Sequence, residues 1–180
     1  MIVKPNYKDA PGYCAYYFDL VTESNLTDAL KNSSSETTAL FSSIPPEYEN
    51  YQYAPAKWTI KQVLQHVIDC ERVYTYRAMR FSRFDATELP GFDENHYADK
   101  DNTIQIAMSQ HIAEYKALRE ATIFLFDGMN DAMLDFKGKA NELHSTARSW
   151  GWMAAGHNRH HCKTIKEKYL PAIKMGNESQ

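Results

Sequence analysis

Apolar residues recur at helical spacing in four long stretches of the chain. Positions i, i+3 and i+4 share one face of a helix, so each stretch predicts an amphipathic helix. The first begins after Asn25, a residue that caps helices well, and ends at Pro45 and Pro46, which cannot continue one. In the second, Thr59 and Gln62 have the spacing of a capping box, which predicts a helix start there.

The third and fourth stretches have similar signals at their ends. The third is expected to begin at Asn102 or Thr103 and to end near Gly128, a residue suited to stop a helix. The fourth is expected to begin at residue 145 or 146 and to end at Leu170. Four long amphipathic helices with few glycines and prolines predict an all-α protein of the four-helix bundle class.

The segments outside these stretches suggest how the chain is divided. We expect residues 1–24 to form an arm whose aromatic cluster packs on the body, residues 25–171 to form the bundle, and residues 172–180 to form a loose polar tail. The connection over residues 84–102 is long for a compact helical domain, so it either carries function or crosses the bundle. Residues 129–145 are expected to form a second loop.

Composition and charge exclude several classes of protein. The chain has 180 residues, of which 43% are apolar, and a net charge of −3. Its basic residues alternate with acidic ones, so we expect no nucleic-acid partner. No apolar run reaches the roughly 20 residues that cross a membrane, and no signal peptide is evident. Three cysteines without a spacing pattern favour a reduced, cytoplasmic protein.

Two histidines, His157 and His161, lie four residues apart on the apolar face of the fourth predicted helix. Residues at this spacing have Cβ atoms about 5–6 Å apart, so both imidazoles can bind one metal ion. Burial of an unpartnered imidazole is costly, and one cation would serve both rings. From this helix alone, a metal site and a pair of hydrogen-bonded core histidines are equally good readings.

A bundle builds its metal sites from inward side chains of facing helices, which makes His66 of the second helix the proposed third ligand. Three imidazoles leave room for water, as in catalytic zinc sites, although such a set also suits Ni²⁺, Fe²⁺ or Mn²⁺. His111 is the rival third ligand, but it is more simply read as a hydrogen-bonded core residue. Cys162 points about 100° away from His161 and is excluded.

Other polar residues near the proposed ligands are candidates for secondary roles. Asp69 and Glu71 could accept hydrogen bonds from ligand imidazoles, or could simply be solvated. Arg77 and Arg80 could bind an anionic group, although salt bridges are the plainer reading. His160 lies to one side of the pair on the fourth helix. No residue stands out as a catalytic general base, so the catalytic residues stay unassigned.

Two motifs resemble those of the DinB/YfiT-like superfamily. Residues 57–72 read KWTIKQVLQHVIDCER, similar to the family's Lys-Trp-Ser stretch followed by His, Asp and Glu-Arg. Residues 155–161 read AGHNRHH, similar to its Gly-His-x-x-His-His. The resemblance runs from about Leu20 to Leu170. It departs at Asn158 and Arg159, where a bulky cation follows the first histidine of the motif, and at the serines of the first helix.

The resemblance implies a fold, a site and a class of function. It implies an up-down-down-up bundle, which accounts for the long 84–102 connection. It also implies a divalent ion, Zn²⁺ or Ni²⁺, held by His66, His157 and His161, and a homodimer. Characterised relatives include transferases that use low-molecular-weight thiols.

We therefore expect a metal-dependent enzyme for a small-molecule substrate, either a thiol-dependent S-transferase or a hydrolase. The alternatives are a non-catalytic metal-binding stress or sensor module, and a helical scaffold without metal.

Overall fold

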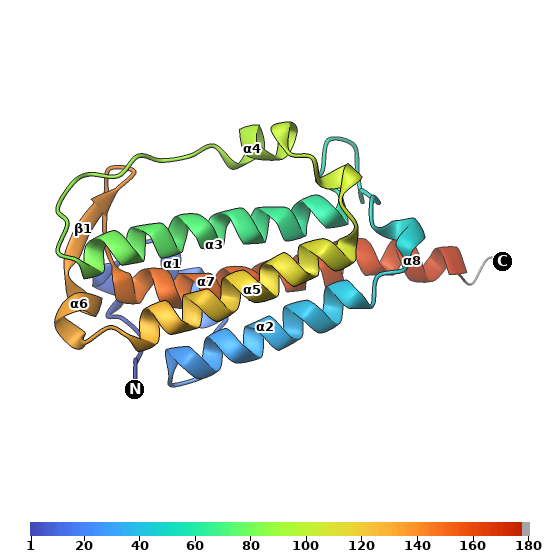
Figure 1. Cartoon of the computed structure of the whole chain (residues 1–180). Helices are drawn as coiled ribbons and strands as arrows, with labels where there is room; N and C mark the ends of the chain where they lie inside the picture. The colour runs from blue at the N-terminus through green and yellow to red at the C-terminus, as the bar shows by residue number, and fades with distance from the viewer. Residues whose placement is uncertain (178–180) are drawn as a thin grey trace.

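A computed structural model describes residues 1–177, with side chains through Ile173, and its main feature is a bundle of four long helices (Figure 1). The bundle helices are α2 (Leu26–Ser42), α3 (Ile60–Ser82), α5 (Met108–Asp127) and α7 (Ala147–Thr164). α2 and α7 run in one direction and α3 and α5 in the other, with α3 and α5 joined by a segment that crosses the whole length of the bundle (Figure 1). The expected up-down-down-up order is therefore confirmed.

The helix starts follow from local hydrogen bonds. Thr59 and Gln62 form the predicted capping box of α3, and Thr146 and Ser149 form another at α7. α5 begins at Met108, five or six residues later than expected, because Thr103–Gln105 form a separate 3₁₀ turn, η3, and Ile106 and Ala107 are extended. The Lys61 ammonium binds the carbonyl oxygens of Ile104 and Ile106, each at 3.0 Å, and so takes acceptors that a longer helix would use.

The fourth helix does not end at Leu170. It passes through a π-helical turn, η4 (Ile165–Tyr169), into α8 (Leu170–Asn177), so residues 172–177 of the predicted tail are helical. Proline lacks an N–H and clashes with the preceding turn of a regular helix, and the wider turn before Pro171 lets the chain stay helical. Residues 178–180 lie outside the described residues.

The connections contain more structure than their sequences predict. The crossover holds α4 (Glu94–Lys100), and residues 129–146 hold α6 (Asp131–Asp135) and a hairpin of β1 (Lys137–Ala140) and β2 (Leu143–Thr146). The strands pair antiparallel, with Lys137 opposite Thr146. Leu89 of the crossover adds to β1, donating to the Lys139 carbonyl at 3.0 Å and accepting from the Asn141 amide at 2.9 Å. The crossover is thus fastened to the hairpin.

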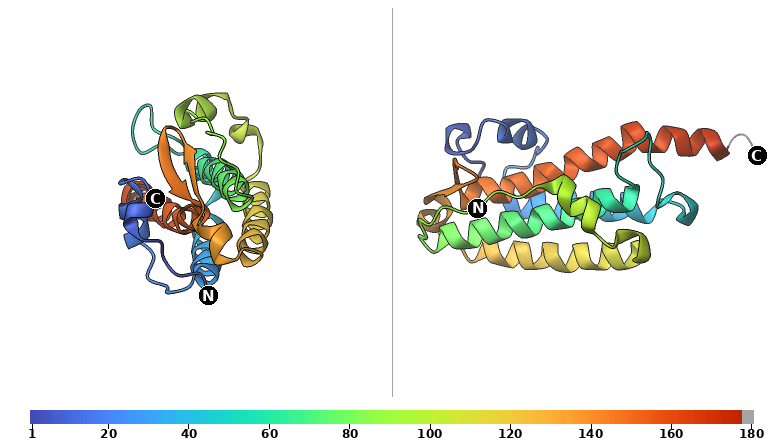
Figure 2. Two further views of the ribbon diagram at one scale, coloured as in Figure 1. Left: turned by 90° about the vertical axis from the view of Figure 1, so that its left-hand side faces the viewer. Right: turned by 90° about the horizontal axis from the view of Figure 1, so that it is seen from above.

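The N-terminal arm lies along α7, on the side away from α5 (Figure 2). It contains the short turn η1 (Tyr7–Asp9) and the helix α1 (Cys14–Asp19). Outside the arm, the turn η2 (Pro46–Tyr48) follows α2. A Cβ at Gly156 would lie 2.1 Å from the Tyr17 carbonyl oxygen, so only glycine permits this approach of α1 to α7. The arm therefore packs on the body through its backbone as well as through its aromatic rings.

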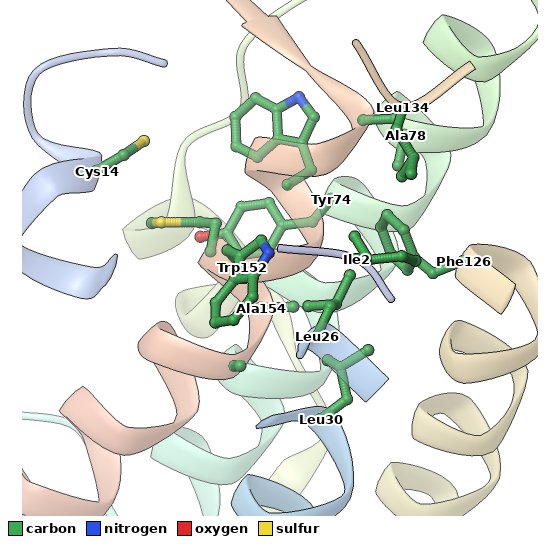
Figure 3. Packing of buried hydrophobic residues seen from close by; sticks show 14 of the residues in the cluster. Ile2, Cys14, Leu26, Leu30, Tyr74, Ala78, Phe126, Leu134, Trp152 and Ala154 are labelled. Atoms are coloured by element: carbon green, nitrogen blue, oxygen red, sulfur yellow. The ribbon is translucent and has the colours of Figure 1, made fainter. Parts of the chain in front are cut away.

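Two apolar clusters fill the bundle on either side of its middle. Near the hairpin end, Leu26 and Leu30 of α2, Tyr74 and Ala78 of α3 and Phe126 of α5 pack together (Figure 3). The other cluster lies toward α8 and includes Ile60, Leu64, Tyr115 and Ile165. No helix within residues 1–177 is long and apolar enough to span a membrane.

Candidate metal centre

The structure brings His66, His157 and His161 together between α3 and α7. His66 lies in the second turn of α3, so the capping box that begins this helix also sets the position of His66 along it. His157 and His161 lie one turn apart on α7 and face α3. Two helices that are separate in the sequence therefore each contribute to one group of three imidazoles.

The distances fit a shared metal ion. His157 Nε2 lies 3.1 Å from His66 Nε2 and 3.1 Å from His161 Nε2. Two nitrogens bound to one tetrahedral ion at 2.0–2.1 Å are about 3.4 Å apart. A neutral Nε2 has either one proton or one lone pair, so His157 cannot hydrogen-bond well to both neighbours at once. Three lone pairs directed at one cation would satisfy all three Nε2 atoms.

Burial keeps the three imidazoles neutral, which is the form that binds metals. It lowers the pKa of His66 to about 4, with a smaller contribution from the nearby His160. The pKa values of His157 and His161 also lie well below 6.5, first through burial and then through repulsion from the neighbouring histidines. His161 Nδ1 is buried without a hydrogen-bond partner among the described residues.

Aromatic rings surround the cluster. The Trp58 ring lies against His66 with centroids 4.6 Å apart, and the edge of Tyr74 meets His157 at 5.7 Å. The Cys70 sulfur lies 3.6 Å from His66 Nε2, and burial raises the pKa of this thiol, so it is protonated at neutral pH. Among the described residues, the group of potential metal donors that lie within 4.8 Å of one another consists of His66, His157 and His161, without Cys70.

All three histidines line one pocket of about 370 Å³. This volume falls within the range of about 300–1,000 Å³ that holds small organic ligands. The other lining residues come from the arm, the crossover, the hairpin turn and both helices, and they are Tyr13, Tyr17, Trp58, Tyr74, Arg77, Gly91, Phe92, Glu94, Asn141, Met153 and His160. The pocket thus places a cation, a carboxylate and several hydroxyl groups near the three imidazoles.

The two candidate anion-binding arginines have different positions. Arg77 is buried and lines the pocket, where its guanidinium lies over the Trp150 ring at 4.9 Å. Arg80 lies outside the pocket and forms an ion pair with Asp85. The plainer reading from the sequence therefore holds for Arg80, whereas Arg77 faces the site.

His160 and Asp69 lie at the edge of the site. His160 lines the pocket, and its Nδ1 lies 3.0 Å from the Tyr16 hydroxyl of the arm. Asp69 accepts hydrogen bonds from Gln65 at 2.9 Å and Arg72 at 3.4 Å. Among the described hydrogen bonds, none joins Asp69 to an imidazole.

Glu71 has a different role from the one suggested by the sequence. Its two carboxylate oxygens accept from Nε and Nη2 of Arg119, each at 2.8 Å, and Thr122 donates to it at 2.7 Å. Arg119 also binds Ser33 of α2, and it donates to Asn158 of α7 once the Asn158 amide is oriented to suit its neighbours. Glu71 is therefore a structural partner of Arg119 and not an acceptor for a ligand imidazole.

His111 does not belong to the group of three. It is buried at the start of α5, and its Nε2 lies 3.5 Å from the Thr103 carbonyl oxygen. The plainer reading, a core histidine near a backbone acceptor, agrees with this position.

Several pocket residues were absent from the sequence-based assignment. Tyr13 and Tyr17 belong to the arm, and Asn141 belongs to the hairpin turn. Trp58 directly precedes Thr59, the N-cap of α3. Trp58 carried a signal, since it lies in the motif over residues 57–72. The others lack such a signal, because only the docking of arm and hairpin brings them to α3 and α7.

Comparisons with known proteins agree with this architecture. YfiT from Bacillus subtilis, described as a probable metal-dependent hydrolase with an unusual four-helix bundle topology, has a similar structure, with a TM-score of 0.72. The two chains are 16% identical, and the match covers 96% of this chain and 93% of YfiT. No curated protein matches the sequence. The family model of the DinB superfamily matches residues 29–165, most of the chain, and the protein therefore belongs to the DinB superfamily.

Proposed function

We propose that this protein is a metal-dependent enzyme that acts on a small molecule. The observation that supports it best is the position of His66, His157 and His161 in the wall of a single pocket with Arg77 and Glu94. A purely structural metal site has four protein ligands and is closed, whereas three ligands beside a pocket leave a position for water or substrate.

The three histidines would hold a divalent ion, Zn²⁺ or Ni²⁺ in our proposal. When bound, such an ion would supply Lewis-acid chemistry and lower the pKa of a water or thiol on it. Trp58 and Phe92 would exclude bulk water from the reacting atoms. Burial holds the pKa of Tyr74 well above 10, so its hydroxyl stays protonated.

Hydrolysis is our first candidate for the reaction. The description of YfiT as a probable metal-dependent hydrolase supports it, because the two chains share their fold over nearly their whole length. In this reaction the three histidines would hold an ion that lowers the pKa of water, and the pocket would hold the substrate.

Transfer to or from a low-molecular-weight thiol is the second candidate, and a second pocket favours it. A pocket of about 260 Å³ shares Trp58, His160 and His161 with the first one and extends toward Lys57 and Tyr169. Two ligands could therefore approach the three imidazoles from two sides, which a hydrolase does not need.

Two further proposals come from the sequence: the resemblance to DinB relatives supports the first, and three cysteines without a spacing pattern support the second. We propose that the protein is a homodimer and that it works in the cytoplasm. Light scattering on the purified protein would test the first, and fractionation of the producing cells would test the second.

Elemental analysis is the first test of the enzyme proposal. We expect close to one divalent ion per wild-type chain and little in His66→Ala or His157→Ala, because each removes one of three donors. His111→Ala, which removes a buried histidine outside the group, is the matched control and should keep the ion. A wild-type protein that neither retains metal nor binds added Zn²⁺ or Ni²⁺ would refute the proposal.

Activity then separates the candidates. The metal-loaded protein is assayed against esters and amides in water, and against electrophiles with added thiols. Turnover that His157→Ala abolishes supports an enzyme, and dependence on the thiol identifies a transferase. Metal that stabilises the fold, without turnover on either panel, favours the non-catalytic module instead.

A further inference from the structure

Arg77 is a buried cation without an anionic partner. Its residue is only 5% exposed, and its one described hydrogen bond runs from Nη2 to the Pro90 carbonyl oxygen at 3.1 Å. A guanidinium has five N–H donors, and buried charges in proteins are normally paired. Among the described residues, no carboxylate forms an ion pair with Arg77.

The other buried arginines each have the carboxylate partner that Arg77 lacks. Arg119 is paired with Glu71, and Arg148 is paired with Asp131 and Asp135. The bundle can thus provide carboxylates for buried guanidinium groups. Glu94 is a carboxylate in the same pocket as Arg77, yet no described ion pair joins the two. Among the buried arginines of the described residues, Arg77 is therefore the one without a carboxylate partner.

Aromatic rings fix the direction in which Arg77 can bind. Its guanidinium lies 4.9 Å from the centroid of Trp150 and 6.0 Å from that of Phe92. Stacking on these rings covers the faces of the planar group and leaves its N–H edges for an anion. The fork of N–H groups matches the two oxygens of a carboxylate or of a phosphate.

A continuous wall connects Arg77 to the three imidazoles. Trp150 stacks on Tyr74 with centroids 5.2 Å apart, and Tyr74 in turn meets His157. Arg77 follows His66 by eleven residues on α3, so its Cα lies about 16 Å farther along the helix axis, and its long side chain spans part of that distance to reach the same pocket. A ligand that reaches both ends of the pocket is therefore extended, with its anionic group at Arg77.

We propose that Arg77 is the binding residue for the anionic end of the substrate, and that the substrate is a small organic anion with an apolar body. The anion is a carboxylate or a phosphate, and the apolar body lies against Tyr74, Phe92 and Met153. For the reacting end, this inference rests on the proposed metal-dependent function. Binding at Arg77 itself requires no metal.

The test is calorimetric titration of the full-length protein, as purified and after removal of metal by a chelator. Phenylacetate is the anionic probe, and phenylacetamide is its neutral counterpart of the same shape. We expect phenylacetate to bind at least about tenfold more tightly in both preparations, because an ionic hydrogen bond to Arg77 exceeds a neutral one. Equal binding of the two probes, or binding of neither, would overturn the inference.

Two arginine variants on the same helix make the test specific. Arg77→Met should weaken phenylacetate binding at least about tenfold and leave phenylacetamide unchanged. Arg80→Met removes a cation outside the pocket and should change neither affinity. If phenylacetate binds only the metal-loaded protein, and binds Arg77→Met as well as wild type, the anion binds the metal. That outcome rejects the role of Arg77 and leaves the proposed function standing.

Arg77→Lys covers the case in which Arg77→Met does not fold. It keeps the charge but loses the fork, so it should bind phenylacetate more weakly than wild type does, yet still more tightly than it binds phenylacetamide. The wild-type comparison of acid and amide does not depend on any variant. Phenylphosphonate, titrated in the same way, shows by its affinity relative to phenylacetate which anionic group the site prefers.

Discussion

Arg119 connects all four bundle helices through its side chain. It forms a bidentate pair with Glu71 of α3, donates to the Leu30 carbonyl and Ser33 hydroxyl of α2 at 2.8 Å each, and contacts Asn158 of α7. Both members of the pair are almost fully buried. Removal of one buried charge leaves the other without compensation, which costs far more than removal of both.

We predict that Arg119→Met destabilises the protein by about 3–5 kcal/mol. The double variant Glu71→Leu with Arg119→Met should lose much less than the sum of the two single variants, since neither charge is then left unpaired. Urea unfolding of all four proteins gives the coupling energy. Strictly additive losses would mean that the pair contributes nothing as a pair.

The ion pair of Glu23 with Arg159 predicts how the stability of the protein depends on pH. The Arg159 guanidinium binds both Glu23 oxygens at 2.7 Å and lowers the pKa of this carboxyl from 4.5 to about 2. The folded protein therefore holds this proton less tightly than the unfolded chain. The stabilisation is fully present above pH 4.5 and is lost as the pH falls toward 2.

Glu23→Gln should therefore cost stability at pH 7 and much less at pH 3. We expect a difference on the order of 1–2 kcal/mol at pH 7, reduced by solvent screening at the edge of the bundle. Urea unfolding at both pH values measures it. A cost that is the same at pH 3 and pH 7 would contradict this account.

At the scale of elements, the contact of α1 with α7 decides whether the arm can line the pocket. The backbone of Tyr17 lies so close to Gly156 that a Cβ there would be 2.1 Å from a carbonyl oxygen. A backbone atom cannot rotate away as a side chain can, so α1 would have to move. Tyr13 and Tyr17 would move with it.

We predict that Gly156→Ala separates the arm from the body and leaves the bundle folded. Limited proteolysis should then cut within residues 1–24 faster than in wild type, while far-ultraviolet circular dichroism changes little. Gly128→Ala is the matched control, because a Cβ there meets its nearest neighbours at 3.6 Å and should not expose the arm. Unchanged cleavage in Gly156→Ala would show that α7 accommodates the methyl group.

The hairpin is one of the elements that the apolar pattern did not predict. Its residues include Lys, Gly and Asn, which are typical of loops, and each strand has only four residues. Asn141 and Glu142 adopt positive φ values of 50° and 63°, which form the tight turn. Leu89 of the crossover pairs with β1 through two backbone hydrogen bonds, and the spacing of apolar residues in the sequence does not predict this pairing.

At the scale of the whole molecule, the histidine group joins two helices that meet only in the folded chain. Any ligand that binds the folded protein alone stabilises it by mass action, by about 2.7 kcal/mol at 100 times its dissociation constant. For a protein of this size, 1 kcal/mol corresponds to roughly 2–4 °C in Tm.

Saturating Zn²⁺ or Ni²⁺ should therefore raise the Tm of chelator-treated protein by about 5–10 °C. His161→Ala should abolish most of this shift, and His111→Ala should retain it. Thermal unfolding followed by circular dichroism measures both. An equal shift in wild type and His161→Ala would place the metal elsewhere on the molecule.

The sequence by itself determined the four long helices, the capping box of α3 and the spacing of His157 and His161 on one helix face. These features depend on residues within a few positions of one another, so apolar spacing and local hydrogen bonds are enough to predict them. The motifs also identified His66 as the third member of the group, through resemblance to the DinB superfamily.

Only the tertiary structure decided which polar residues share a site. Glu71 and Arg77 lie on the same helix six residues apart, yet one pairs with Arg119 in the core and the other faces the pocket. Their surroundings come from α5 in one case and from α7 and the crossover in the other. Spacing along a chain fixes the direction of a side chain from its own helix, whereas its partners depend on how distant segments pack against that helix.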